Sequence, residues 1–245
     1  MKPRSALFAL CAIAAGAVTT SANAVTLTAT SGDRSASATL SLVGGNLRIV
    51  LANTSTADAT APMDILTAFF FDSAYTFTPV SAMLTTGSAV SFGPDGGGNV
   101  GGEFAYASGL SGAPLGATQG ISSAGFGLFG NANFGGPNLQ DPVAIDGLNY
   151  GITTAGDDIT TGNAAVTGGF PLIKNSVTFL LTPSAALTED MLATLFTKWS
   201  FQYGTALTEP NVPCCEQDVP EPGSLALLGL GLMGLGLSRR RTFKK

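Results

Sequence analysis

The chain contains no histidine among its 245 residues. This absence excludes Ser-His-Asp and Cys-His catalysis, and it excludes metal sites that use an imidazole ligand. Charged residues make up only 11% of the chain, well below the roughly 25% of an ordinary soluble domain. The glycine clusters lack the lysine of a phosphate-binding loop, so nucleotide binding is not expected.

Basic residues are scarce in the middle of the chain. Seven of the 11 basic residues lie at the two ends, which leaves Arg34, Arg48, Lys174 and Lys198 between them. The same stretch carries 15 of the 16 acidic residues, so four positive charges face 15 negative ones and the net charge is near −11. Such a body does not bind nucleic acid by neutralising phosphates. It is expected to stay soluble by self-repulsion or to attract cations.

The N-terminus has the three parts of a secretory signal peptide. Lys2 and Arg4 form a basic start, residues 6–18 are apolar, and Ala22-Asn23-Ala24 has the small-residue pattern of a cleavage site. We therefore expect residues 1–24 to direct export through the Sec machinery and to be removed by signal peptidase. The mature chain is then expected to begin at Val25.

Residues 25–208 predict an all-β ectodomain, an antiparallel β-sandwich with one short helix. Residues 37–43 and 46–53 alternate polar and apolar side chains around a Gly44-Gly45-Asn46 turn, which is typical of a β-hairpin. Residues 65–71 are continuously apolar, which fits a buried sandwich strand, although periodicity alone leaves a buried short helix open.

Further strands are expected at residues 89–92, 103–107, 126–129, 176–181 and 197–203. Thr188, followed by Glu189 and Asp190, predicts the start of one or two helical turns. Short strands separated by Gly and Pro turns favour the antiparallel sandwich.

The C-terminus combines a proline motif, an apolar run and a basic cluster. Pro220-Glu221-Pro222 precedes the apolar residues 225–237, and Arg239, Arg240 and Arg241 follow. As a helix, about 13 to 15 residues span only about 20 Å, less than the roughly 30 Å of a hydrocarbon core. The basic cluster orients the C-terminus towards the cytoplasm. These features predict a single hydrophobic helix that holds the body outside the membrane only weakly.

Residues 220–245 resemble the PEP-CTERM sorting signal, because these three parts occur in the same order and spacing. The resemblance implies recognition by an exosortase, an integral-membrane transpeptidase of Gram-negative bacteria that cuts near Pro220-Glu221-Pro222. It also implies a transient inner-membrane intermediate, followed by a surface or extracellular location and an association with exopolysaccharide and biofilm. A Phe-Gln-Tyr-Gly-Thr strand similar to residues 201–205 recurs near the end of many ectodomains of this class.

Residues 209–219 are expected to form a proline-stiffened linker that contains Cys214 and Cys215. In an oxidising compartment, adjacent cysteines can form a strained vicinal disulfide, intermolecular bridges or free thiols. These three alternatives remain open on the residues alone. Covalent cross-linking to another surface molecule is one hypothesis for their role.

Calcium is the best candidate for a small ligand, and no other cofactor is expected. Asp95, Asp157 and Asp158 lie in glycine-rich segments and offer the hard oxygen ligands that calcium prefers, as do Asn99, Asp141 and Asp146. Their spacing matches neither an EF-hand nor a nonapeptide repeat.

Three classes of function are compatible with these features. The first is a structural surface or matrix protein without enzymatic activity. The second is an adhesin or lectin-like module with loop-bound calcium. The third is a secreted hydrolase that uses paired carboxylates, but nothing in the sequence brings two acids together.

Overall fold

The alternating segments near the N-terminus form the first part of a five-stranded sheet. The computed structural model describes residues 23–140, 145 and 147–214. In strand order, the sheet consists of β1 (Val25–Ser31), β2 (Arg34–Val43), β3 (Asn46–Asn53), β11 (Ser176–Pro183) and β5 (Phe77–Leu84). All four pairings are antiparallel. The predicted hairpin is confirmed: β2 and β3 pair in register across the Gly44-Gly45 turn, where both glycines have positive φ.

A second sheet of eight strands is centred on β4. Its members are β13 (Asn211–Pro213), β12 (Lys198–Tyr203), β4 (Leu66–Asp72), β9 (Gly151–Thr153), β10 (Leu172–Lys174) and β6 (Ala89–Ser91), with β8 (Gln119–Ser122) on β4 and β7 (Ala105–Ser108) on β8. β9 and β10 pair in parallel, and the other pairings are antiparallel.

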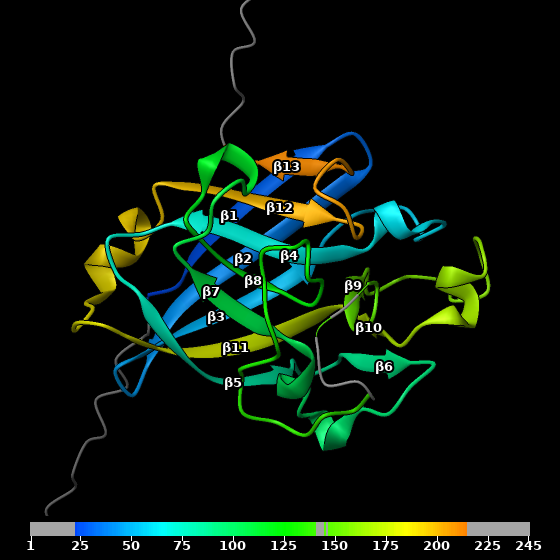
Figure 1. Ribbon diagram of the computed structural model, residues 1–245, viewed down its shortest axis with the longest axis horizontal. Coiled ribbons are helices and arrows are strands. Elements are labelled where there is room, and N and C mark those ends of the chain that lie inside the picture. Colours follow the sequence, from blue (N-terminus) through cyan, green and yellow to red (C-terminus); the bar gives the residue numbers. More distant parts are fainter. Residues whose placement is uncertain (1–22, 141–144, 146, 215–245) are drawn as a thin grey trace, which may run out of the picture.

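The two sheets pack face to face around one apolar core (Figure 1). On the five-stranded sheet, alternate residues such as Leu40, Ile49 and Phe179 are fully buried. They meet Phe69 and Phe201 from the eight-stranded sheet, whose rings stack with their centroids 5.2 Å apart. The antiparallel β-sandwich class is therefore confirmed, and its second sheet is mixed because β9 and β10 pair in parallel.

β4 is buried on both faces, as its continuous apolar run predicted. Its inner face packs into the main core, and its outer face carries Phe70, which belongs to a separate apolar cluster. Phe126 and Phe129 cover this outer face, with ring centroids 6.0 and 5.8 Å from that of Phe70. The strand predicted at residues 126–129 is therefore wrong: these residues form a turn, with Phe126 at a φ of 52°, and they cover β4 instead of pairing with a neighbour.

The helical elements of the described chain are single turns or little more. They are the 3₁₀ turns η1 (Pro62–Asp64), η2 (Gly96–Gly98), η3 (Gly101–Glu103), η4 (Pro114–Gly116) and η6 (Glu189–Thr194), and the π turn η5 (Ala165–Gly169). The predicted helix after Thr188 is η6, where Thr188 is the N-cap without a side-chain capping bond. No helix in the described part of the chain is long and apolar enough to cross a membrane.

The remaining strand predictions are confirmed in position. Residues 89–92 and 103–107 overlap β6 and β7, residues 176–181 lie within β11, and residues 197–203 contain β12. Three- and four-residue strands such as β8, β9 and β13 were not expected.

Candidate functional site

The body ends in a strand pair that is tied down by one buried glutamine. Gln202 of β12 is fully buried, and its Nε2 lies 2.9–3.2 Å from the main-chain oxygens of Tyr203, Ala206, Glu209 and Pro210. Its Oε1 accepts a bond from Asn211 Nδ2 at 3.1 Å. Gln202 therefore organises the loop between β12 and β13, within the Phe-Gln-Tyr-Gly-Thr segment noted in the sequence.

The same loop is closed from its other side by Glu209. Its carboxylate accepts bonds from the main-chain nitrogens of Thr205 at 2.6 Å and Ala206 at 2.8 Å. Gly204 has a φ of +75°, and a Cβ at this position would collide with the Glu209 carboxylate. The backbone conformation therefore favours glycine here, and a Cβ would also displace the Glu209 carboxylate from its position.

Tyr203 connects this end of the eight-stranded sheet to the other sheet. Its hydroxyl donates to the main-chain oxygen of Ser35 on β2, at 2.9 Å. Burial of the ring raises the pKa of Tyr203 to about 12, because the charged phenolate would be poorly solvated.

The folded body extends into the segment that was expected to be a linker. β13 occupies Asn211–Pro213, Val212 is buried in the main core, and the Cys214 nitrogen donates to the Trp199 oxygen at 2.9 Å. The linker prediction for residues 209–219 is therefore wrong for residues 211–213, which form a strand. Val212 packs into the apolar core, and Gln202 holds the preceding loop by hydrogen bonds. Cys215 lies outside the described residues, so the hypotheses for the cysteine pair stay predictions.

The predicted sorting residues also lie beyond the described part of the chain. This applies to Pro220, Glu221 and Pro222, to the hydrophobic helix, and to the basic residues Arg239, Arg240 and Arg241. Residues 1–22 of the predicted signal peptide, which spans residues 1–24, also lie outside the described part of the chain. β1 begins at Val25, the residue expected to become the mature N-terminus.

Three of the aspartates considered for calcium are each engaged locally, whereas Asp141 and Asp146 lie outside the described residues. Asp95 caps η2 by accepting from the Gly97 nitrogen at 2.9 Å. Asp157 is buried and accepts from the Ala59 nitrogen at 2.8 Å. Asp158 accepts from the nitrogen and hydroxyl of Thr160, and these bonds lower its pKa. Within residues 23–140, 145 and 147–214, no three acidic or cysteine side chains form a group that could hold a metal ion.

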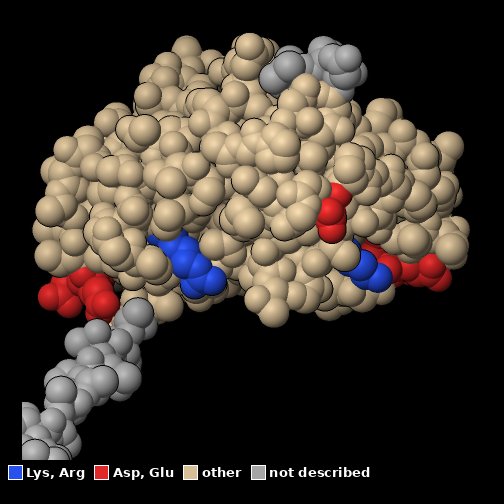
Figure 2. Space-filling model, turned by 90° about the horizontal axis from the view of Figure 1, so that it is seen from below, with Lys and Arg blue, Asp and Glu red and all other residues tan. Residues whose placement is uncertain are grey.

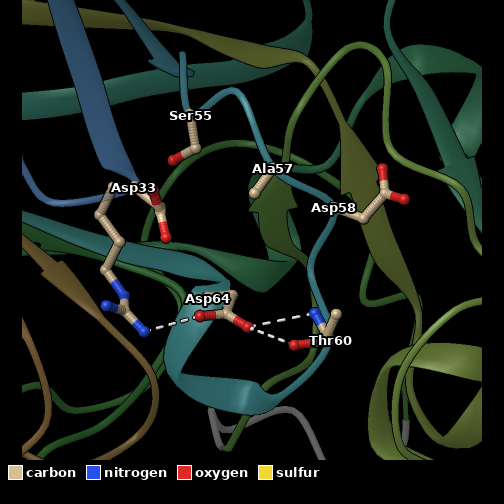
Figure 3. Close-up of a pocket in the computed structure, with 7 residues that line it drawn as sticks. Asp33, Ser55, Ala57, Asp58, Thr60 and Asp64 are labelled. Carbon is tan, nitrogen blue, oxygen red and sulfur yellow. Dashed lines mark hydrogen bonds and ion pairs between the residues drawn. The ribbon is translucent and has the colours of Figure 1, made fainter.

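A polar depression lies beside these loops and was not found from the sequence. It has a volume of about 180 Å³ and is lined by Asp33, Arg34, Ser55, Ala57, Asp58, Thr60 and Asp64. Its residues come from the β1–β2 turn, the start of β2 and the β3–β4 connection (Figure 3). A second depression of about 320 Å³ adjoins it and shares Ser55 and Asp58. The acids that line the polar depression are scattered in loops and follow no known motif spacing, so the sequence gives no signal for this site.

The hydrogen bonds of Asp64 show what the polar depression can do chemically. Oδ1 forms an ion pair with Arg34 at 2.7 Å, and Oδ2 accepts from the nitrogen and hydroxyl of Thr60 at 3.1 Å (Figure 3). Both oxygens are thus occupied in holding the loop, rather than poised to transfer a proton. Asp58 Oδ1 accepts from the Asp158 nitrogen at 3.2 Å. The lining can hydrogen-bond a polar ligand, but it shows no nucleophile with an adjacent base.

Charge is sparse over the face of the body drawn in Figure 2. A few acidic and basic side chains lie on a surface that is otherwise uncharged. The surface in this view therefore shows few charges and no extended basic patch.

Comparison with known proteins identifies the C-terminal segment. Residues 218–241 match the family model of the PEP-CTERM protein-sorting motif. No curated protein and no solved structure matches the chain significantly. The match covers the motif predicted from Pro220-Glu221-Pro222, the apolar run and the arginines. The chain is therefore an exported, exosortase-sorted protein of the cell surface, whose C-terminus carries a PEP-CTERM protein-sorting motif.

Proposed function

We propose that this protein is a structural component of the cell surface or extracellular matrix, associated with exopolysaccharide or biofilm and without enzymatic activity. The observation that carries the proposal is the sorting motif at residues 218–241, which follows a β-sandwich whose strand β13 ends at Pro213. The body is thus the cargo that sorting delivers. After export by the Sec machinery and signal peptidase, the tail holds it briefly at the inner membrane of a Gram-negative bacterium until the exosortase cuts.

The interior of the sandwich supports a structural role. Its large buried side chains pack against one another, and its buried polar groups, such as Gln202, serve to fix loops. The complete sequence has no histidine. The carboxylates of the polar depression bind neighbouring groups of the same chain.

Intact mass spectrometry of the protein from its native cells tests the sorting part of the proposal. We expect a form that begins at Val25 and ends near Pro220-Glu221-Pro222, and its loss in a strain without exosortase. A Glu221→Ala variant should accumulate with its tail, whereas Glu216→Ala is a matched control outside the motif. A mature form that still ends at Lys245 would refute sorting.

The matrix part needs a separate measurement. We expect the processed protein to sediment with purified exopolysaccharide and to be released when the polysaccharide is digested. Equal recovery in the soluble fraction with and without the polysaccharide would argue against this role.

A binding module is the second candidate, and the two adjoining depressions that share Ser55 and Asp58 favour it. Hydroxyl and carboxylate groups in a shallow site suit hydrogen bonding to sugar hydroxyls. A glycan array with and without calcium tests this function, with Asp58→Ala as the site variant and Asp190→Ala as an acidic control elsewhere. Calcium titration should show heat only if the loops bind the ion.

A further inference from the structure

The last described residues of the body lie very close in sequence to the sorting motif. β13 pairs with β12 through residues 211–213, and the Cys214 nitrogen bonds to the Trp199 oxygen. The motif match begins at residue 218, and Pro220 is six residues after Cys214. The chain is therefore held by the sheet almost up to the point where it is recognised.

This short connection limits how far the motif can lie from the body. Six residues, even if fully extended, span at most about 20 Å. A folded body of this size has a radius of gyration of about 16 Å and hence a diameter of about 40 Å. The connection can span at most about half the diameter of the body, so the body stays close to an enzyme that binds the motif.

Residues 211–214, which we call the exit, are held firmly by the sheet, so the limit on the reach of the motif applies. Val212 is buried in the main core, and Asn211 Nδ2 donates to Ser200 Oγ and Gln202 Oε1, both at 3.1 Å. Lengthening the connection by peeling off β13 would expose Val212 and break these bonds. Residues 211–214 therefore stay in the sheet while the body is folded.

We infer that the end of the sandwich around the exit is a docking surface for the membrane-embedded transpeptidase that cuts the sorting motif. This inference rests on processing at that motif. The surface includes Lys198, whose side chain is 58% exposed and lies 3.9 Å from Asp72, and the chain's single tryptophan, Trp199, opposite Cys214. A folded body thus presents the motif in one restricted orientation.

Changing the connection length tests the inference in cells that contain the transpeptidase, with intact mass as the readout of tail removal over time. Deletion of residues 215–217 reduces the reach from Cys214 to Pro220 to about 10 Å. We expect this deletion to slow processing by about tenfold or more. Replacement of the same residues by Gly-Ser-Gly keeps the length and should leave the rate unchanged. Circular dichroism and thermal unfolding confirm that each body is folded.

Charge reversal at the exit tests the surface itself. We expect Lys198→Glu to slow processing severalfold, whereas Arg48→Glu, on the outer face of the other sheet, should be processed like the wild type. Equal rates for these two variants, or for the deletion and the wild type, would overturn the docking surface while leaving sorting intact. A Gly-Ser-Gly variant as slow as the deletion would show that the residues are read rather than the length. If the wild type itself kept its tail, sorting would be refuted as well.

Discussion

Replacement of Gln202 by leucine should destabilise the whole body, because this side chain organises the last loop. An amide nitrogen has two hydrogens, so the four main-chain oxygens around Nε2 share two full bonds. Each such bond contributes about 1 kcal/mol, and a buried oxygen left without a donor costs about 1–3 kcal/mol. Pro210 and Ala206 keep the main-chain donors Tyr203 and Glu209. We therefore expect a loss of about 2–4 kcal/mol in the free energy of unfolding.

Urea unfolding of the purified mature protein measures this loss. With a slope of about 2 kcal/mol per molar, the midpoint should fall by about 1–2 M. Thr182→Val is a matched control, because it removes a hydroxyl that donates to Asn46 at an exposed position, at 2.8 Å. We expect this control to change stability by less than about 0.5 kcal/mol. The reasoning is refuted if Gln202→Leu and Thr182→Val unfold at the same urea concentration.

Three further predictions concern single groups. Because the pKa of Tyr203 is raised from about 10 to about 12, the folded state holds the phenol proton more tightly than the unfolded state does. The stability that this protonated phenol contributes is complete below pH 10 and is lost as pH rises towards 12. In alkaline thermal melts, Tyr203→Phe should therefore lose less stability than the wild type. Glu103, buried, accepts from the Leu139 nitrogen at 2.7 Å, so Glu103→Ala should cost about 1–3 kcal/mol in urea unfolding, and an unchanged midpoint would contradict this. A Cβ on Gly102 would overlap the main chain at residue 137, whereas Gly156 has open space around it; Gly102→Ala should lower the melting temperature clearly and Gly156→Ala should not.

Local patterns predicted one pairing whose two strands are close in sequence. The β2–β3 hairpin was predictable because the alternation and the Gly44-Gly45 turn lie within one short segment. β5 was not predictable. It is an edge strand that contains Pro79, at the register shift against β11, and proline is unusual within a strand. Strands of three residues, such as β9 and β13, have too few residues to show a period and depend on distant partners.

The site divides in the same way. The sorting motif was predictable because its parts are contiguous in sequence, and the family model confirms it. The polar depression was not, because Asp33 and Asp64 come from different connections and are brought together by the pairing of β2 with β3. The apolar run at residues 126–129 was wrongly predicted to be a strand for a related reason. An apolar segment can pack against a sheet face as well as pair within the sheet, and these residues pack against Phe70.

The place of β12 beside β4 has a consequence for how the chain folds as it is made. β4 can pair with β8 soon after synthesis, but its partner β12 follows about 130 residues after it in the chain. Contacts between segments so far apart form slowly, and until they form the apolar side of β4 stays open to aggregation. Phe69 and Phe71 stay partly uncovered until the last strands appear. The eight-stranded sheet is therefore completed only after its last strands, β12 and β13, have been made.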